Sequence, residues 1–469
     1  MNAPDEKRLR TLFAGAGQGH LFDEWGVLSP EERARFLTQL ASVDLEQVAV
    51  QAALLSRGPE EAGSQRFEPP ETFPLRRDPR QQRLAQDAVA AGTELLAKGR
   101  VGFLLVAGGQ ASRLGYDGPK GAFQIGPVSQ RSLFEIQARR LLAVRERHQV
   151  RAPWYVMTSP ANDAATRAFF EQHHHFGLDP RDVVFFAQAM IPAMDPAGRL
   201  LRAGPGELFL APNGHGGVLL AMERSGALAD ARARGLTQLS YFQVDNPLAR
   251  PADPLFLGLH ALQGAGMSSK VVAKRDAAEK VGVIGRAGDK LGCIEYSDLP
   301  AALREERDDS GELRFRAGNI AVHAIEIGFV ERLTRGGLLL PWHLARKKML
   351  VWERGELVQR EGIKFEAFVF DALAASERSV TLEVARSEEF SPVKNASGED
   401  SPASARRDLC RLHAEWARGA GFELPPPDPE GLHPIEVDPL LAEDAETFRG
   451  RPRRPLITER GHFYVHEHH

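Results

Sequence analysis

The chain has 469 residues, a hydrophobic fraction of 43%, a charged fraction of 26% and a formal net charge of −4, ordinary values for a water-soluble protein with more than one hydrophobic core. The weak negative charge excludes a general attraction to nucleic acid or to an anionic membrane, so any phosphate ligand must be held by local cations and backbone amides. Because only two cysteines occur and neither a secretory signal nor a membrane-length apolar run is present, we expect a cytoplasmic protein without structural disulfides or membrane spans.

The first hundred residues are polar and have a helical pattern. Ser29 to Glu32 form a capping box with proline at the first helical position, which predicts a helix with one apolar face. Asp44 indicates the start of a second helix. A stretch rich in Pro, Gly and Arg, residues 56–80, predicts a connecting loop, and an alanine-rich helix then ends near Gly99.

From Val101 onward, short apolar runs alternate with helical patterns. Buried strands are expected at residues 101–107, 153–159, 183–188, 239–246 and 269–275. A capping box from Ser132 to Glu135 opens one of the intervening helices. Strands that alternate with helices predict an α/β fold with a central, Rossmann-like, mainly parallel sheet.

Two later segments depart from this alternation. Residues 281–296 predict an antiparallel hairpin with its turn at Gly288 and Asp289, placed near a ligand. Residues 405–421 predict a helix, and a proline-rich linker and two short strand patterns, IEVDPLL and HFYV, follow it. We therefore expect three domains: a helical N-terminal region (1–99), a catalytic α/β domain (100–400) and a C-terminal helix with a small β unit (401–469).

The most informative segment is LLVAGGQASRLGYDGPKG, residues 104–121. A buried strand leads into a loop with five glycines, which let the backbone approach phosphates and turn N–H groups toward an anion. Arg113 and Lys120 in this loop are suited to neutralise phosphate charge. The spacing excludes a P-loop, because glycine follows Lys120, and a GxGxxG fingerprint is absent. Such a loop lies at the carboxyl end of a strand, where α/β sheets bind ligands.

This segment and several later motifs resemble the UDP-N-acetylhexosamine pyrophosphorylases, within the wider group of UDP-glucose and UDP-sugar pyrophosphorylases. The family signature, similar to LAGGQGTRLG…PKG, stands here as Val106 to Gly115 followed by Pro119 to Gly121. The further motifs are SLFEIQARR, PWYVMTS, FFAQAMIPAM, APNGHGG, VDNPL, EKVGVI, IEYSD, AGNIAVH, GIKFEAFVFD, EFSPVKNA and SPASARRDL. The resemblance covers nearly the whole chain and implies transfer of a uridylyl group from UTP to a hexose-1-phosphate, with release of pyrophosphate.

The resemblance also implies a role for each matching position. Positions that contact the uridine part of UTP correspond to Val106, Ala107, Gly108, Gly109, Gln188 and Gly214. The cations implied to hold the phosphates are Arg113, Lys120, Lys364 and Lys394. The positions similar to sugar contacts are His215, Gly282, Glu295, Tyr296 and Asn319. Asp245 matches an aspartate that helps to place a divalent metal, Mg²⁺ or Mn²⁺, and a carboxylate suits the preference of Mg²⁺ for oxygen.

These implied roles suit a direct in-line displacement at the α-phosphorus of UTP. The two reactants are anions, so the protein must hold them together and neutralise the charge that develops. Four cations and a metal meet that need without a nucleophilic side chain. Ping-pong kinetics would contradict this expectation.

One motif departs from the N-acetylhexosamine pattern and leaves the sugar open. In APNGHGG, His215 stands where the N-acetylhexosamine enzymes usually carry Asn, and Gly-His-Gly is similar to the UDP-glucose relatives. The motifs AGNIAVH, FVFD and IEVDPLL favour the N-acetylhexosamine branch. We therefore expect N-acetylglucosamine-1-phosphate first, with glucose-1-phosphate or a broader hexose range as the alternative. A catalytically inactive, sugar-nucleotide-binding regulator is a second alternative, which the retained charged positions disfavour. The oligomeric state stays open.

Overall fold

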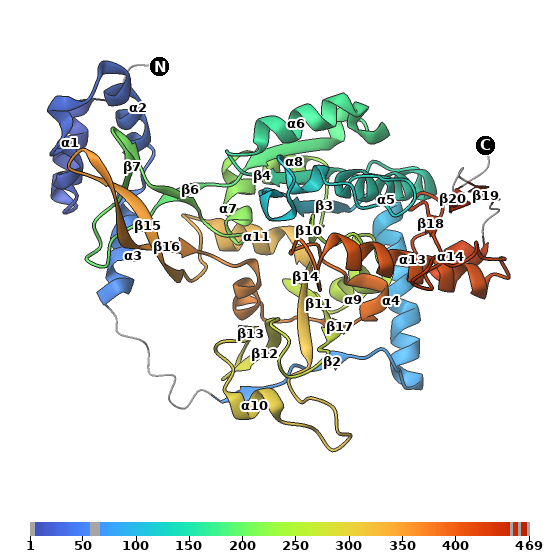
Figure 1. The fold of residues 1–469 in the computed structure, drawn as a ribbon. Helices are drawn as coiled ribbons and strands as arrows, with labels where there is room; N and C mark the ends of the chain where they lie inside the picture. Colours follow the sequence, from blue (N-terminus) through green and yellow to red (C-terminus); the bar gives the residue numbers. More distant parts are fainter. Residues whose placement is uncertain (1–4, 57–65, 451–453, 458–460, 467–469) are drawn as a thin grey trace. The chain divides into compact units, whose positions relative to one another are not determined.

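The computed structural model describes residues 5–56, 66–450, 454–457 and 461–466, and the chain forms two compact units (Figure 1). Unit 1 combines Met1–Gln65, Gln188–Gly217 and Leu339–Asp371. Unit 2 combines Arg66–Ala187, Val218–Leu338 and Ala372–His469. Each unit thus joins segments that are distant in the sequence, and the linear boundaries at residues 99 and 400 stay a prediction.

Unit 2 is built on an 11-stranded sheet whose main path runs β2-β17-β11-β14-β10-β3-β4-β5. In chain order these strands are β2 (Thr72–Phe73), β3 (Val101–Val106), β4 (Trp154–Thr158), β5 (Val183–Ala187), β10 (Gln238–Gln243), β11 (Met267–Ala273), β14 (Ala317–Glu326) and β17 (Thr381–Glu383). β3 pairs in parallel with β4 and β10, and β4 with β5. The predicted mainly parallel sheet is confirmed, and all five expected strands are present.

β14 runs antiparallel to both of its neighbours, β10 and β11. Its first residue, Ala317, lies opposite Ala273, the last residue of β11. The beginning of β14 therefore reaches the sheet edge at which the parallel strands end.

The helices of unit 2 pack their apolar residues against this sheet. They are α4 (Pro79–Ala97), α5 (Leu133–His148), α6 (Asp163–Gln172), α7 (Gly217–Arg224), α8 (Ala227–Ala233), α9 (Pro254–Leu262), α10 (Ala301–Glu305), α11 (Ile327–Thr334), α12 (Arg386–Glu389), α13 (Pro402–Gly419) and α14 (Ala445–Gly450). Leu96 of α4, Phe134 of α5 and Phe256 of α9 share one core cluster with Phe103 and Trp154 of the sheet. No helix in the described part of the chain is both long and apolar enough to cross a bilayer.

The capping box predicted at Ser132 forms only in part. The Ser132 hydroxyl accepts a hydrogen bond from the Glu135 backbone N–H at 3.1 Å. The Glu135 carboxylate, however, accepts from Arg131 Nε at 2.7 Å instead of returning to the Ser132 backbone. A charged guanidinium is the stronger partner for a carboxylate.

The predicted hairpin is confirmed as β12 (Val283–Ala287) and β13 (Lys290–Ile294), with Gly288 in the turn at φ +61°. Two short strands, β1 (Phe67–Glu68) and β2, lie in the stretch that was expected to be only a loop. β1 pairs with β12 and β2 with β17, so tertiary pairing overrides the local composition. Residues 57–65 of this stretch lie outside the described residues.

The C-terminal helix and strands are also confirmed. α13 begins at Pro402 behind a capping box at Ser401, and β18 (Ile435–Val437), β20 (Phe463–His466) and β19 (Arg454–Ile457) form a small sheet in that order. Glu436 in β18 accepts hydrogen bonds from the backbone N–H groups of Val128, at 2.8 Å, and Ser129, at 2.7 Å. These bonds fix the small sheet to the segment that follows the glycine-rich loop.

Unit 2 contains a buried ammonium group, on β11. Lys270 of β11 is 0% exposed, and its Nζ lies 2.7 Å from Asp253 Oδ2 and 2.6 Å from Glu389 Oε2. Asp253 caps α9 and Glu389 ends α12. Two carboxylates thus compensate the lysine for its lost hydration and join β11 to both helices.

Unit 1 combines three N-terminal helices with short strands and one long hairpin. Its elements are α1 (Glu6–Gly15), α2 (Pro30–Ala41), α3 (Leu45–Ser56), β6 (Met190–Pro192), β7 (Arg202–Gly204), β8 (Glu207–Leu208), β9 (Leu210–Pro212), β15 (His343–Glu353) and β16 (Glu356–Glu366). The capping box at Ser29 and the helix start after Asp44 are confirmed. Phe13 and Phe36 of the helices share a core cluster with Ile363 and Phe365 of β16.

Candidate active site

The glycine-rich loop after β3 is held through its carbonyl groups. Asn162 Nδ2 donates to the carbonyls of Ala107, at 2.9 Å, and Gly109, at 3.2 Å, and the Ser159 hydroxyl donates to Gly108 O at 2.9 Å. In a trans peptide the C=O and N–H groups point in opposite directions. The N–H groups of Gly108 and Gly109 therefore point away from Ser159 and Asn162, as an anion cradle requires.

Lys120 and Asp245 meet at the carboxyl edge of the sheet. Lys120 closes the loop after β3, where its N–H donates to Gly109 O at 3.1 Å, and Asp245 follows the neighbouring parallel strand β10. Lys120 Nζ lies 3.4 Å from Asp245 Oδ2, and the side chains are only 19% and 14% exposed. The structure thus brings a predicted phosphate cation and the predicted metal carboxylate together beside the anion cradle.

The donor set at Asp245 fits a divalent cation that arrives with a nucleotide. Among the residues that the structure describes, no group of three or more His, Cys, Asp or Glu side chains is arranged to hold a metal ion. Mg²⁺ is usually bound through one or two carboxylates together with substrate phosphates and waters. One carboxylate beside the glycine-rich loop suits that mode of binding.

Asn246 connects this edge to the segment that carries Lys394. Its Nδ2 donates to Glu389 O at 2.7 Å, and its Oδ1 accepts from the Ser391 N–H at 3.1 Å. The Val393 N–H donates to Asp245 O at 2.8 Å. Sequence reasoning missed Asn246, although its position between Asp245 and a proline was a signal for a role in local hydrogen bonding.

Lys394 itself is exposed, with Nζ 5.8 Å from the centre of the Phe390 ring. Arg113 is also exposed, on the 3₁₀ turn Ser112–Leu114. Within the described residues no hydrogen bond or ion pair links Arg113 to another predicted site side chain. The backbone therefore places the Lys394 segment next to Asp245, whereas Arg113 shares only its loop with Lys120.

The predicted sugar positions of unit 2 gather where β12–β13 meets β14. The Asn319 N–H donates to Gly282 O at 2.9 Å, and Asn319 Nδ2 lies 3.7 Å from Cys293 Sγ. A Cβ placed on Gly282 would lie 2.6 Å from Cys293 Sγ and 3.4 Å from Glu295 Oε1. Gly282, Glu295 and Asn319 thus form one group, and sequence reasoning missed the thiol between them. Tyr296 follows Glu295 and is 40% exposed.

In unit 1 the APNGHGG segment packs backbone to backbone on the segment after β16. The Gly216 N–H donates to Ala367 O at 2.8 Å, and Gln188 Nε2 donates to Gly214 O at 2.8 Å. Gly214 has φ +82°, and a Cβ there would lie 2.3 Å from Ala367 O. A Cβ on Gly216 would lie 2.6 Å from the carbonyl carbon of Phe368. Packing therefore requires both glycines beside His215, whichever ligand it contacts.

In this packing His215 is a neutral imidazole that accepts a backbone hydrogen bond through Nδ1. Its ring stacks on Phe368, with centroids 5.2 Å apart, and contacts Phe370 at 5.5 Å. Burial, assisted by the neighbouring His343, lowers the pKa of His215 to about 4. The Val369 N–H donates to His215 Nδ1 at 3.2 Å, so the ring proton is on Nε2. Sequence reasoning missed both phenylalanines, although the FVFD motif contained them.

Lys364 lies on β16, opposite Ala345 of β15. Its Nζ is 5.6 Å from the centre of the Phe209 ring, also in unit 1. This cation–π contact orients the ammonium group without neutralising it.

Comparisons with known proteins show the family of this chain. A family model described as UTP–glucose-1-phosphate uridylyltransferase matches residues 63–413. The human UDP-N-acetylhexosamine pyrophosphorylase-like protein 1 is 37% identical over 97% of both chains, and the UDP-N-acetylglucosamine pyrophosphorylase of Saccharomyces cerevisiae is 33% identical over 88% of this chain and 91% of its own. The solved UDP-N-acetylglucosamine pyrophosphorylase of Trypanosoma brucei superimposes with a TM-score of 0.80 at 29% identity, over 95% of this chain and 94% of that one. The chain therefore belongs to the UTP–glucose-1-phosphate uridylyltransferase family and, within it, to the UDP-N-acetylhexosamine pyrophosphorylases.

Proposed function

We propose that this protein is a uridylyltransferase that makes UDP-N-acetylglucosamine and pyrophosphate from UTP and N-acetylglucosamine-1-phosphate. The observation that carries the proposal is the Lys120–Asp245 pair, 3.4 Å apart, at the end of the glycine-rich loop, where the Lys120 N–H donates to Gly109 O. Relatives across nearly the full chain are UDP-N-acetylglucosamine pyrophosphorylases by name, which supports this substrate.

The reaction is a direct displacement at phosphorus. A phosphate oxygen of the sugar-1-phosphate forms a bond to the α-phosphorus of UTP, the bond from that phosphorus to the bridging oxygen breaks, and pyrophosphate leaves with the electron pair. Lys120, Arg113 and Lys394 are assigned to hold the phosphates and to neutralise the charge that develops on the leaving group. A divalent cation at Asp245, when bound, supplies further positive charge to the phosphate oxygens.

The remaining substrate contacts are assigned within each unit. In unit 2, Val106, Ala107, Gly108 and Gly109 contact the uridine part, and Gly282, Glu295, Tyr296 and Asn319 contact the sugar. In unit 1, Gln188 and Gly214 contact the uracil, His215 contacts the sugar, and Lys364 contacts a phosphate. The hydrogen bond between Gln188 and Gly214, the grouping of Gly282 with Asn319 and the Nε2–H donor of His215 support these assignments.

Glucose-1-phosphate is the second candidate substrate, and His215 is the observation that favours it. The Gly-His-Gly around His215 is similar to the UDP-glucose relatives, and a neutral Nε2–H donor suits a sugar hydroxyl without requiring an acetamido group. The imidazole is held by stacking on Phe368 and by the hydrogen bond from the Val369 N–H. It therefore selects among sugars by the position of its Nε2–H group and not by a charge.

The test measures pyrophosphate release from UTP and Mg²⁺ in parallel reactions with the 1-phosphates of N-acetylglucosamine, N-acetylgalactosamine, glucose and galactose. We expect the highest kcat/KM with N-acetylglucosamine-1-phosphate. A preference for glucose-1-phosphate would move the enzyme to the second candidate. Tight UDP binding without pyrophosphate release from any sugar would contradict the proposed catalysis.

A further inference from the structure

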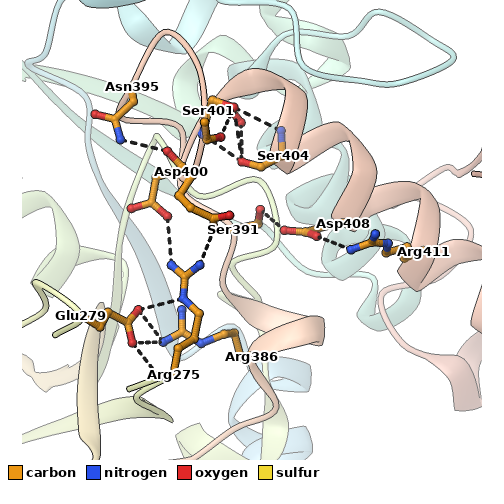
Figure 2. A network of polar contacts seen from close by, with 12 residues as sticks. Arg275, Glu279, Arg386, Ser391, Asn395, Asp400, Ser401, Ser404, Asp408 and Arg411 are labelled. Carbon is orange, nitrogen blue, oxygen red and sulfur yellow. Dashed lines mark hydrogen bonds and ion pairs between the residues drawn. The ribbon is translucent and has the colours of Figure 1, made fainter. Parts of the chain in front are cut away.

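The segment that carries Lys394 is tied to the loop after β11 by a cluster of ion pairs centred on Glu279 (Figure 2). Glu279 Oε1 and Oε2 accept hydrogen bonds from Arg386 Nη2 at 2.8 Å and 3.0 Å. The Glu279 carboxylate also accepts from the backbone N–H of Arg275 at 2.7 Å and from Arg275 Nε at 3.3 Å. Figure 2 shows dashed lines from this carboxylate to both arginine side chains.

Arg275 continues the cluster toward Lys394. Its guanidinium pairs with Glu399 and, at 3.6 Å, with Asp400. The Asp400 carbonyl accepts from the N–H groups of Lys394, at 2.6 Å, and Asn395, at 2.9 Å, which closes residues 394–400 into a compact loop. We call Arg275, Glu279, Arg386, Glu399 and Asp400 the Glu279 clamp.

The other side of the same segment is fixed from the interior of the sheet. Lys270 pairs with Glu389, Asn246 bonds to Glu389 and Ser391, and Val393 bonds to Asp245. Residues 389–393 are therefore held against the strand ends by buried contacts. The loop that follows, at 394–400, is held by the Glu279 clamp on one side and, at its end, by the buried Ser401, whose hydroxyl donates to Gly398 O at 2.7 Å.

We propose that Arg275, Glu279 and Arg386 are positioning residues that hold Lys394 at its working place beside Asp245. The inference rests on the proposed function, in which Lys394 contacts a phosphate, and adds residues that do not touch the substrate. The clamp joins two parts of the site: Glu279 is three residues before Gly282, a predicted sugar position, and Asp400 closes the loop that begins at Lys394.

The geometry distinguishes positioning from simple stabilisation. Glu399 is 73% exposed, and exposed ion pairs add little to folding stability. Glu279 is only 11% exposed and serves two arginines at once, so its loss releases both ends of the clamp together. A reacting group displaced by about 1 Å can lower the rate by about 100-fold, so loss of the clamp is expected to affect turnover beyond any effect on stability.

The test is a double-mutant cycle on kcat/KM with UTP, Mg²⁺ and the preferred sugar-1-phosphate. The four proteins are the wild type, Glu279→Gln, Lys394→Ala and the double variant. We expect Glu279→Gln to lower kcat/KM by about tenfold in the wild type but by less than about twofold in the Lys394→Ala background, because contacting residues couple and independent ones do not. The matched control is Glu331→Gln, which removes the 2.6 Å pair between Arg232 of α8 and Glu331 of α11 and is expected to keep kcat/KM within about twofold of the wild type.

The outcomes separate the clamp from the function on which it rests. Equal losses in both backgrounds would overturn the positioning role, because the clamp would then act independently of Lys394. Full activity of Lys394→Ala would also overturn it and would leave the proposed reaction intact. Absence of turnover in the wild type would remove the proposed function itself. A melting temperature recorded for each variant shows whether a loss comes from unfolding.

Discussion

Lys120 and Asp245 neutralise one another across 3.4 Å, and in the proposed function each turns to a new partner when a nucleotide and a divalent cation bind. Because the two side chains are only partly exposed, little water screens their charges, and each interacts more strongly with nearby charged groups. The pair therefore provides one cation and one carboxylate at the strand ends, where the phosphates of UTP and a divalent cation are expected to bind.

The first prediction concerns Lys120→Ala. Loss of the ammonium group removes charge stabilisation from the triphosphate, so we expect kcat/KM for UTP to fall by about 100-fold or more. Steady-state kinetics at low UTP measure this. Lys98→Ala is the control, because Lys98 forms an exposed i,i+4 pair with Glu94 and is expected to keep full activity. Unchanged turnover of Lys120→Ala at low UTP would contradict the assignment.

At this scale the sequence predicts residues that lie next to recognisable strand ends. The glycine-rich loop and Asp245 each follow a buried strand, so their shared edge follows from parallel pairing. Ser159, Asn162 and Asn246 were missed because their partners are 51, 55 and 143 residues away. Such contacts exist only after the strands have assembled.

Among the elements, the segment around His215 depends on two glycines in close backbone contact. The second prediction compares Gly214→Ala with Gly226→Ala, which have nearly equal φ values of +82° and +83°. Both variants lose the conformational freedom of glycine, but only at Gly214 does the new methyl group meet a backbone oxygen, at 2.3 Å, whereas nothing lies within 4 Å at Gly226. We expect Gly214→Ala to cost about 1–2 kcal/mol more in unfolding free energy than Gly226→Ala.

Denaturant titration of both glycine variants gives that difference, and kinetics provide a second measurement. The contact at Gly214 fixes the neighbouring His215 against Phe368, so this variant alone is also expected to raise KM for the sugar-1-phosphate. Equal stabilities of the two variants would mean that the segment after β16 moves aside without cost.

The third prediction concerns the contact between α13 and β18. Burial, and then repulsion from Arg140, lowers the pKa of His413 to about 3, and its Nδ1 accepts from the Val437 N–H at 3.3 Å. Between pH 6.5 and 3 the unfolded chain protonates this imidazole while the folded chain keeps it neutral. The contribution to stability is therefore complete above pH 6.5 and is lost as the pH falls.

His413→Gln tests this linkage by removing the titrating group while it keeps a hydrogen-bond acceptor. Between pH 7 and pH 5 the unfolding free energy of the wild type is expected to fall by up to about 2 kcal/mol more than that of the variant. Chemical denaturation at the two pH values measures the difference. Parallel curves for the two proteins would show that His413 is not the titrating group.

Helices and strands were predicted correctly where the sequence contains a continuous apolar run or a capping box. β14 was not among the predicted strands, and its direction depends on pairing with its neighbours β10 and β11. The hairpin β15–β16 was missed because consecutive charged residues, such as Arg346, Lys347 and Lys348, interrupt the period-two alternation of a strand. β1 and β2 were missed because each has only two residues.

For the whole molecule, the division into two units shows which distant segments pack together, which composition along the chain does not reveal. Residues 188–217 and 339–371 join the N-terminal helices in unit 1 although a long stretch of unit 2 separates them in the sequence. Their apolar residues share the cluster that contains Phe13 and Phe365. Composition changes mark positions along the chain, whereas a core is defined by contacts between distant positions.

The fourth prediction concerns removal of divalent cations from the whole protein. Because Asp245 is a single carboxylate and the described residues offer no three-ligand cluster, the metal is expected to bind with UTP and not to support the fold. EDTA should therefore abolish pyrophosphate release but leave the melting temperature within about 1 °C. Calorimetry and the turnover assay, both repeated after Mg²⁺ is restored, check the two parts. A large drop in melting temperature would reveal a structural metal.

The burial of Lys270 also means that chemical labelling of this residue can report how often the central sheet opens. An amine-reactive reagent reaches an exposed lysine such as Lys394 directly, but Lys270 is enclosed by Asp253 and Glu389 and is 0% exposed. Acylation of Lys270 therefore requires β11 to separate from α9 and α12. The ratio of label at these two lysines, read by peptide mass spectrometry, follows how often the central sheet opens while the protein remains predominantly native.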